Sequence, residues 1–425
     1  VQERLRRHLA ATGIRAGEER WLLGRGFDQE GFVERRWITR ADLDAVSTEV
    51  PICIRRVCGH ALVANSAAIA RAGIVGPVES PGGPDSLAQG ILTEERMAAI
   101  DRAIPAPTAA DYRQAAALAT AEAAAVGFTG VHCLVTEAEE IAALRHLEAT
   151  GRLPVRIRLQ LAYAMLPSLR ALGLATGFGS DRLTLGAIKI FSDGSLGART
   201  AALFEPYADD PGNRGDLLFP QEELDARIQA VADAGCQVCV HAIGDRALDA
   251  VLTAFERCRD PQPRPRVEHA SLAPPPLIER MRRIGAVAAV QPQFVVSDWW
   301  TPQRLGPERA RWAYPFRTML AAGVPLAGGT DCPVERLLAL QVIARAVHRG
   351  GMIPEEALTV DEAIALLTVG AAFAAGEERL AGALAPGHRA DFVVLAEDPR
   401  EVPPDAIETV PVRLTVVAGE IVHRA

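Results

Sequence analysis

The sequence predicts an α/β fold of the (β/α)8 TIM-barrel type, built around a parallel sheet. From about residue 115 onward, short apolar or β-branched runs alternate with longer Ala-, Leu- and Arg-rich stretches of helical period, which is typical of βα units. Small aliphatic residues dominate the 425-residue chain, and only 5% of its residues are aromatic. This composition suits helices that pack closely on a parallel sheet.

Seven short segments are the candidates for barrel strands within residues 111–380. They are 129–135, 155–163, 186–192, 237–243, 266–270, 286–291 and 324–330. Stretches of helical period lie between most of them, for example 222–234 and 276–284. A closed barrel of this type has eight strands. We therefore expect a barrel that lacks its first strand in this chain.

The two ends of the chain differ from the barrel region. Residues 1–110 contain WLLGRGFD at 21–28, an apolar strand at 51–57 and a Gly/Pro loop at 75–84. We interpret them as a cap insertion that precedes the second barrel strand. In residues 381–425, two β runs at 391–399 and 412–422 predict part of a small β-sandwich.

The bulk properties exclude several classes of partner. The net charge is −8 and no basic stripe is present, which argues against nucleic acid. No apolar run reaches the roughly 18 residues that span a bilayer, and the first residues do not form a signal peptide. We expect a cytoplasmic protein that acts on a small molecule, and we leave open whether it is a monomer or a homodimer.

The seven cysteines are an odd number, which favours reduced thiols in the cytoplasm. Cys236 and Cys239 form a CxxC pair that could be a redox motif or half of a zinc site. The pair lies in an apolar strand and has no second CxxC partner, so we favour buried thiols.

Lys189 is the single lysine of the chain, and the other 44 of the 45 cationic residues are arginines. Arginine stays protonated at any working pH, whereas a buried lysine can lose its proton and act as a nucleophile. A neutral lysine can react with CO2 to form an anionic carbamate that binds metal. Chance is the alternative explanation for the count.

Four residues of the types that bind metals follow or end separate strand candidates: Lys189, His241, His269 and Asp331. Functional side chains converge at the C-terminal rim of such a barrel. Two imidazoles, a carboxylate and a carbamylated lysine would suit a divalent metal ion.

Each of these residues also has a structural explanation. A lone histidine at a strand end is more often a hydrogen-bonded core residue than a ligand. Asp331 could be a helix N-cap, and Lys189 could pair with Asp193. Four such residues at the tips of four βα units favour the metal site over these separate explanations.

At these positions the sequence resembles the amidohydrolase superfamily, and within it the amidohydrolase-3 branch that includes N-substituted formamide deformylase-like enzymes. The resemblance covers nearly the whole chain. It rests on GRGFD at 24–28, RVCGHALVANSAA at 56–68, IKIFSDGSLGARTAAL at 188–203, VHAIGDRAL at 240–248, RVEHASL at 266–272, AGGTDCPVE at 327–335 and PGHRADFVVL at 386–395.

The resemblance implies a hydrolase of the metal-dependent kind that cleaves a C–N bond in a non-peptide amide, formamide or cyclic amide with a metal-activated water. Lys189 matches the family's carbamylated bridging lysine, and His241 and His269 match ligands of the second metal. Asp331 matches the residue that is both ligand and general base. One or two divalent ions, with zinc as the expected metal, are implied.

Further residues are assigned to the substrate side of this site. His60 matches a rim histidine that could contact substrate or a developing oxyanion, or could be structural. Three tryptophans follow the candidate at 286–291, which would be the seventh strand of the complete barrel: Trp299, Trp300 and Trp312. They could line the substrate pocket or simply pack in the core. A last group is expected to order the rim loops: Asp193, Arg199, Asp245 and Arg246.

The sequence departs from the family in one respect. The family carries a His-x-His pair at the end of its first barrel strand, and no His-x-His occurs here. We expect that the chain begins after this segment. Two alternatives remain open: a truncated or catalytically silent barrel that binds a ligand or partner, and a one-metal hydrolase that uses His241, His269 and Asp331.

Overall fold

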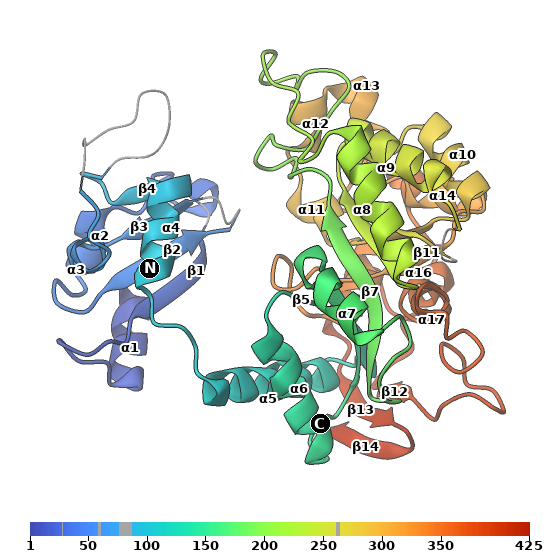
Figure 1. Ribbon diagram of the computed structural model, residues 1–425, viewed down its shortest axis with the longest axis horizontal. Helices are drawn as coiled ribbons and strands as arrows, with labels where there is room; N and C mark the ends of the chain where they lie inside the picture. The colour runs from blue at the N-terminus through green and yellow to red at the C-terminus, as the bar shows by residue number, and fades with distance from the viewer. Residues whose placement is uncertain (28, 58–60, 76–86, 261–263) are drawn as a thin grey trace. The chain divides into compact units, whose positions relative to one another are not determined.

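The computed structural model describes residues 1–27, 29–57, 61–75, 87–260 and 264–425. The chain divides into two compact units, Val1–Thr108 and Ala109–Ala425 (Figure 1). Within the described ranges, no helix combines the length and the apolar character needed to cross a bilayer.

The first unit contains a four-stranded sheet in the order β1-β2-β3-β4, in which β1 and β2 are parallel and the other pairs antiparallel. Its strands are β1 (Leu22–Phe27), β2 (Ile52–Arg56), β3 (Ala61–Ala64) and β4 (Ile91–Thr93). Its helices are α1 (Gln2–Thr12), α2 (Arg40–Asp44), α3 (Ser66–Arg71) and α4 (Glu94–Ala103). The strand expected at 51–57 is confirmed as β2, whereas β1, which lies in the WLLGRGFD run, and β3 and β4 were not foreseen.

The second unit is built on a seven-stranded sheet in the order β11-β10-β9-β8-β7-β6-β5, and every described pair in it is parallel. Its strands are β5 (Gly130–Val135), β6 (Arg156–Ala162), β7 (Leu183–Phe191), β8 (Gln237–Ala242), β9 (Arg266–His269), β10 (Val287–Val290) and β11 (Leu326–Gly328). All seven predicted strands are confirmed, in chain order, and β7 begins three residues earlier than expected.

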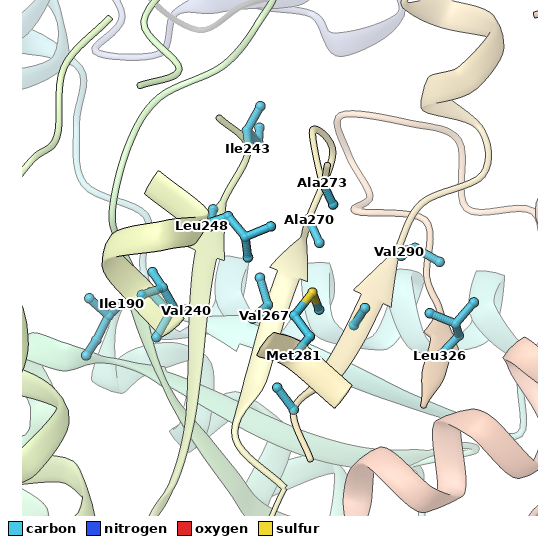
Figure 2. Packing of buried hydrophobic residues seen from close by; sticks show 14 of the residues in the cluster. Ile190, Val240, Ile243, Leu248, Val267, Ala270, Ala273, Met281, Val290 and Leu326 are labelled. Atoms are coloured by element: carbon cyan, nitrogen blue, oxygen red, sulfur yellow. The ribbon is translucent and has the colours of Figure 1, made fainter. Parts of the chain in front are cut away.

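Helices follow the strands, as the alternating pattern predicts. The longer ones are α5 (Ala109–Ala125), α6 (Ala138–Ala149), α8 (Gln221–Asp233), α9 (Asp245–Arg257), α10 (Pro275–Ile284), α15 (Ala339–Val347) and α16 (Val360–Leu367). Figure 2 shows Ile190, Val240 and Val267 of three adjacent strands in one buried layer with Leu248 of α9 and Met281 of α10. Because side chains alternate along a strand, the residues between these aliphatic positions project from the opposite face.

The sheet is strongly curled, as a contact across its other face demonstrates. Nη1 of Arg266 on β9 lies 2.6 Å from Nδ1 of His132 on β5. Four strand spacings separate β9 from β5 in the sheet, which would place them about 19 Å apart if the sheet were flat. The contact therefore spans a concave face, as in a TIM-like fold. In the sheet that the described residues form, β5 and β11 are the two edge strands.

The tail of the second unit forms a separate antiparallel sheet of β12 (Phe392–Leu395), β13 (Val412–Val417) and β14 (Glu420–Arg424). The run predicted at 412–422 is in fact a hairpin, because the chain reverses at Ala418 and Gly419, both with positive φ. Arg156 of β6 holds the Asp391 carboxylate just before β12 through two contacts of 2.6 and 3.0 Å. The tail is thus fixed to the beginning of a barrel strand.

Candidate active site

The residues predicted to bind metal lie on the concave side of the curled sheet. Lys189 is the seventh residue of β7, His241 lies near the end of β8, and His269 is the last residue of β9. The side chains of all three residues are buried. Lys189 and His241 lie opposite the aliphatic layer of Figure 2, because they alternate with Ile190 and Val240 along their strands. His269 contacts the ring of His241 from the end of β9.

The two imidazoles are in direct contact. The ring centroids of His241 and His269 are 4.5 Å apart, and the rings meet edge to face at 72°. Adjacent parallel strands place them there, since the neighbouring residues Ala242 and His269 are paired in the register of β8 and β9.

The two ring nitrogens of His241 differ in their hydrogen bonding. Its Nε2 lies 2.9 Å from the carbonyl oxygen of Gly194 and 3.3 Å from Oδ1 of Asp193. Both neighbours are acceptors, so Nε2 carries a proton, and Nδ1 is the nitrogen that could bind a metal ion. A hydrogen bond of this kind fixes the tautomer and the ring orientation of a metal-binding histidine.

His269 shows the same arrangement with the nitrogens exchanged. Its Nδ1 donates to Oε1 of Gln291 at 2.7 Å, and Nε2 of Gln291 donates to the carbonyl of Ala289 at 3.0 Å. The second bond orients the amide, so the acceptor oxygen faces the ring and Nε2 of His269 presents the lone pair. Burial, with the charges of His241 and Lys189, holds the pKa of His269 well below its usual value, so the ring is neutral.

Asp193 organises the loop that holds His241. Its buried carboxylate accepts hydrogen bonds from the backbone amides of Ala202 at 2.9 Å, Gly244 at 2.9 Å and Ile243 at 3.1 Å. These contacts connect the segments that follow β7 and β8. The acceptor sites are occupied by these amides and by His241, which disfavours the explanation that Asp193 serves as the partner of Lys189.

Lys189 and Asp331 face the same space. Nζ of Lys189 lies 5.0 Å from the ring centroid of Phe191. The Asp331 side chain is accessible to solvent but surrounded by protein, and this desolvation raises its pKa, while the charges of Lys189 and His241 lower it. The acidic neighbours Glu268 and Glu335 raise it further.

Two of the predicted ligands adopt backbone conformations that are unusual for residues with a side chain. His269 has φ of 76° and Asp331 has φ of 54°. Positive φ in non-glycine residues costs energy and concentrates at functional sites, where the surrounding structure maintains it. Both residues turn at the ends of barrel strands, which is where the sequence places the site.

These residues fit a divalent metal ion by their chemistry. Two imidazoles, each oriented by a hydrogen bond at one nitrogen, are suitable ligands for zinc and related ions. Among the described residues, no group of three His, Cys, Asp or Glu side chains is close enough to hold a metal ion. A carbamate on Lys189 would add an anionic oxygen donor from a residue type other than these four.

The other predicted site residues are His60 and three tryptophans. His60 is not among the described residues. Trp299 has an exposed ring, whereas Trp300 is half-buried beneath the Arg304 guanidinium at 4.2 Å. Trp312 is half-buried beside Arg311. The proposed role of the tryptophans in substrate binding stays a prediction.

The rim residues hold loops through an ion pair and through hydrogen bonds to the backbone. Arg199 pairs with Asp209 at 2.7 Å. Asp245 accepts from the amide of Phe204 at 3.1 Å, and Arg246 donates to the carbonyl of Gly215 at 2.7 Å.

The CxxC pair consists of buried thiols. Cys236 and Cys239 are free cysteines. Burial raises the pKa of Cys239 to about 12, which disfavours the reactive thiolate that redox chemistry requires.

Three residues beside the imidazoles were not singled out from the sequence: Gln291, Phe191 and Phe294. Gln291 ends the strand candidate 286–291, and a polar residue at the C-terminal end of a barrel strand is the signal that could have identified it. Phe191 and Phe294 are apolar, and no pattern in the sequence distinguishes them from core residues.

Comparison with known proteins gives consistent results. A profile described as "Amidohydrolase family" matches residues 2–423. "Putative amidohydrolase YtcJ" from Bacillus subtilis is 33% identical over 95% of this chain and 80% of its own length. The N-substituted formamide deformylase of Arthrobacter pascens is 26% identical over 94% of this chain and 78% of its own length. The crystal structure of an uncharacterized metal-dependent hydrolase from Pyrococcus furiosus superposes with a TM-score of 0.78 at 34% identity, covering 94% of this chain and 81% of that one.

Proposed function

Given that the chain belongs to the amidohydrolase family and that its relatives include an N-substituted formamide deformylase and a metal-dependent hydrolase, we propose that it hydrolyses a C–N bond of a small non-peptide amide, formamide or cyclic amide with the aid of a divalent metal ion. One observation carries the proposal: the buried, contacting imidazoles of His241 and His269, each with one nitrogen hydrogen-bonded and the other able to bind a metal ion. The relative named N-substituted formamide deformylase supports the choice of bond.

In this proposal His241, His269, a carbamylated Lys189 and Asp331 would hold the metal, which we expect to be zinc. Formation of the carbamate joins Nζ of Lys189 to the carbon of CO2 with loss of two protons from the ammonium group, and it converts a cation into an anion. That conversion would remove the positive charge that Lys189 now places beside His269 and Asp331. A bound divalent ion supplies Lewis acidity that polarises a carbonyl and lowers the pKa of water.

Asp331 would act as the proton carrier of the reaction. Its carboxylate would accept a proton from the attacking water and later deliver it to the leaving nitrogen. Desolvation raises its pKa, which helps the carboxyl hold the proton between the two transfers. Asp193 and Gln291 would act on the imidazoles alone, by keeping their donor nitrogens oriented.

A second candidate is a barrel that binds a ligand without catalysis. The sequence feature that favours it is the absence of a His-x-His pair from these 425 residues. A hydrolase with a single metal ion, held by His241, His269 and Asp331, is an intermediate case. Metal content measured by elemental analysis distinguishes zero, one and two ions per chain.

The deciding experiment combines metal content with hydrolysis of a panel of N-substituted formamides, acyl amides and cyclic amides. We expect turnover that requires metal and is abolished in Lys189→Arg, because arginine cannot form the carbamate. Arg227→Lys, a cation exchange on the surface helix α8, is the matched control and should leave turnover unchanged. Activity that survives in Lys189→Arg removes the carbamate from the mechanism, and a metal-loaded protein inactive on the whole panel supports the binding barrel.

A further inference from the structure

Four aromatic rings form a continuous row across the candidate site. The ring of Phe191 lies 5.4 Å from that of His241, His241 lies 4.5 Å from His269, and His269 lies 6.2 Å from Phe294. The row begins at the end of β7, crosses the ends of β8 and β9, and ends in α11 (Phe294–Ser297) after β10. A phenyl ring therefore flanks each imidazole.

Phe191 differs from the other members of this row in its exposure. Its side chain is 42% exposed, whereas His241 and His269 are 8% and 5% exposed. The neighbouring Ile190 is 1% exposed because it projects into the aliphatic layer between the sheet and the helices (Figure 2). Phe191 thus projects from the concave face, next to the imidazoles, with part of its ring uncovered.

The ring is held in place at this position. One side of it faces Nζ of Lys189 at 5.0 Å, and another faces the ring of His241. Isolated apolar residues on a protein surface are common, but this one lies at the C-terminal end of a barrel strand, where substrates of this fold bind. An ordered, uncovered phenyl ring at that point provides an apolar surface for part of a substrate.

We propose that Phe191 is a specificity-determining residue, and that its exposed ring contacts a ring-bearing hydrocarbon substituent of the substrate next to the scissile C–N bond. This inference rests on the proposed function and defines its substrate class more narrowly. Aromatic pairs at centroid separations of 4.5–7 Å contribute about 0.5–1.5 kcal/mol beyond the burial of area. A flat ring on the substrate extends the existing row by one member, whereas a short alkyl chain covers less of the exposed phenyl surface.

The test measures binding and turnover separately with three amides that differ in one substituent: N-(2-phenylethyl)acetamide, N-(2-cyclohexylethyl)acetamide and N-butylacetamide. Binding is measured by calorimetry on chelator-treated protein, in which metal-dependent turnover is absent. Turnover is measured on the metal-loaded protein as kcat and KM. The variants are Phe191→Ala and Phe191→Leu, with Phe178→Ala as the control, because Phe178 is an exposed phenylalanine that precedes the opposite end of the same strand.

The wild-type protein is expected to bind the phenyl amide about tenfold more tightly than the butyl amide, which corresponds to about 1.4 kcal/mol. Phe191→Ala should remove this preference and raise KM for the phenyl amide with little change in kcat. Phe191→Leu should bind the cyclohexyl amide more tightly than the butyl amide but lose the preference for the phenyl amide. Phe178→Ala should behave like the wild type. Circular dichroism shows whether each variant is folded, and the Leu variant provides the test if the Ala variant is not.

Equal affinity of the wild type for the phenyl and butyl amides, or no binding of either, overturns the inference, and so does a preference that survives in both Phe191 variants. If the preference depends on Phe191 but none of the amides is hydrolysed, the proposed reaction fails while the ligand-contacting role of Phe191 stands. If the amides are hydrolysed without dependence on Phe191, the reaction stands and this inference fails.

Discussion

The guanidinium of Arg266 lies 2.6 Å from Nδ1 of His132 across the concave face of the barrel sheet. Because a guanidinium only donates, Nδ1 of His132 must accept, so the imidazole is neutral. Burial, with the charges of Arg266 and Arg158, holds the pKa of His132 well below its usual value. Gln160 completes this polar layer, since its side-chain oxygen accepts from Nη2 of Arg266 at 3.0 Å.

A pH dependence of stability follows from this neutral imidazole. Below the usual histidine pKa of about 6.5, the unfolded chain binds a proton at His132 that the folded chain does not. The free energy of unfolding should therefore fall with acidification by up to about 1.4 kcal/mol per pH unit for this residue. Urea unfolding between pH 7.5 and 5.5 should show a smaller slope in His132→Gln and an unchanged slope in His8→Gln, an exposed control. Identical slopes in His132→Gln and wild type would contradict the prediction.

Asp298 should make an opposite contribution. Desolvation raises its pKa to about 7, although the hydroxyl of Tyr314 donates to its carboxylate and lowers the pKa. The folded chain thus holds a proton up to about pH 7 that the unfolded chain holds only below about pH 4, so stability is lost as the pH rises from about 4 to about 7 and levels off above that. Asp298→Asn should remove this loss between pH 4.5 and 7.5, as measured by thermal or urea unfolding. In Tyr314→Phe the loss should continue to a higher pH, and a loss that ends at a lower pH would show that the hydroxyl does not favour the carboxylate.

Gln291 should affect metal binding without binding metal itself. Replacing it by Leu removes the acceptor that orients His269, and the loss of such a partner typically lowers metal affinity by about 10–100-fold. Titration with zinc in competition with a chromophoric chelator measures this change. Gln303→Leu, on an exposed face, should leave the affinity unaltered. If the two variants bind zinc equally well, the orientation of His269 does not depend on this amide.

Asp193 should be important for the stability of the rim as well as for the site. In Asp193→Asn, an NH2 group would face at least one of the backbone amides that now donate to the carboxylate. A hydrogen bond to a charged group contributes about 1.5–3 kcal/mol, so we expect a loss of about that size in the free energy of unfolding. Asp209→Asn, which weakens only the partly exposed pair with Arg199, should cost less than about 1 kcal/mol. Equal costs in both variants would contradict a special role for Asp193.

The parallel strands were predictable because each is a continuous apolar or alternating run between helical segments. Their chain order in the sheet and the C-terminal position of Lys189, His241 and His269 follow from the right-handed βα connection. The hairpin at 412–424 was not predictable as two strands, because Ala418 occupies a positive-φ position that sequence preference assigns to glycine or asparagine.

The contacts that orient the imidazoles depend on tertiary structure. Asp193 reaches His241 only because the segments after β7 and β8 run side by side. The hydrogen bonds from the backbone amides of Ala202, Ile243 and Gly244 to the Asp193 carboxylate show this arrangement. From the sequence, Lys189 was an equally reasonable partner for this carboxylate. Similarly, Gln291 meets His269 because β10 lies next to β9, and neither residue indicates the other in the sequence.

The attachment of Asp391 to Arg156 has a consequence for protein engineering. Arg156 is buried at the start of β6, and its charge is balanced from the tail and by Asp181. Cutting the polypeptide before β12 would leave the Arg156 guanidinium in the interior with Asp181 but without Asp391, and removing one partner of a buried ion pair commonly costs several kcal/mol. The tail sheet is therefore not a detachable module, and a minimal catalytic fragment has to extend through it.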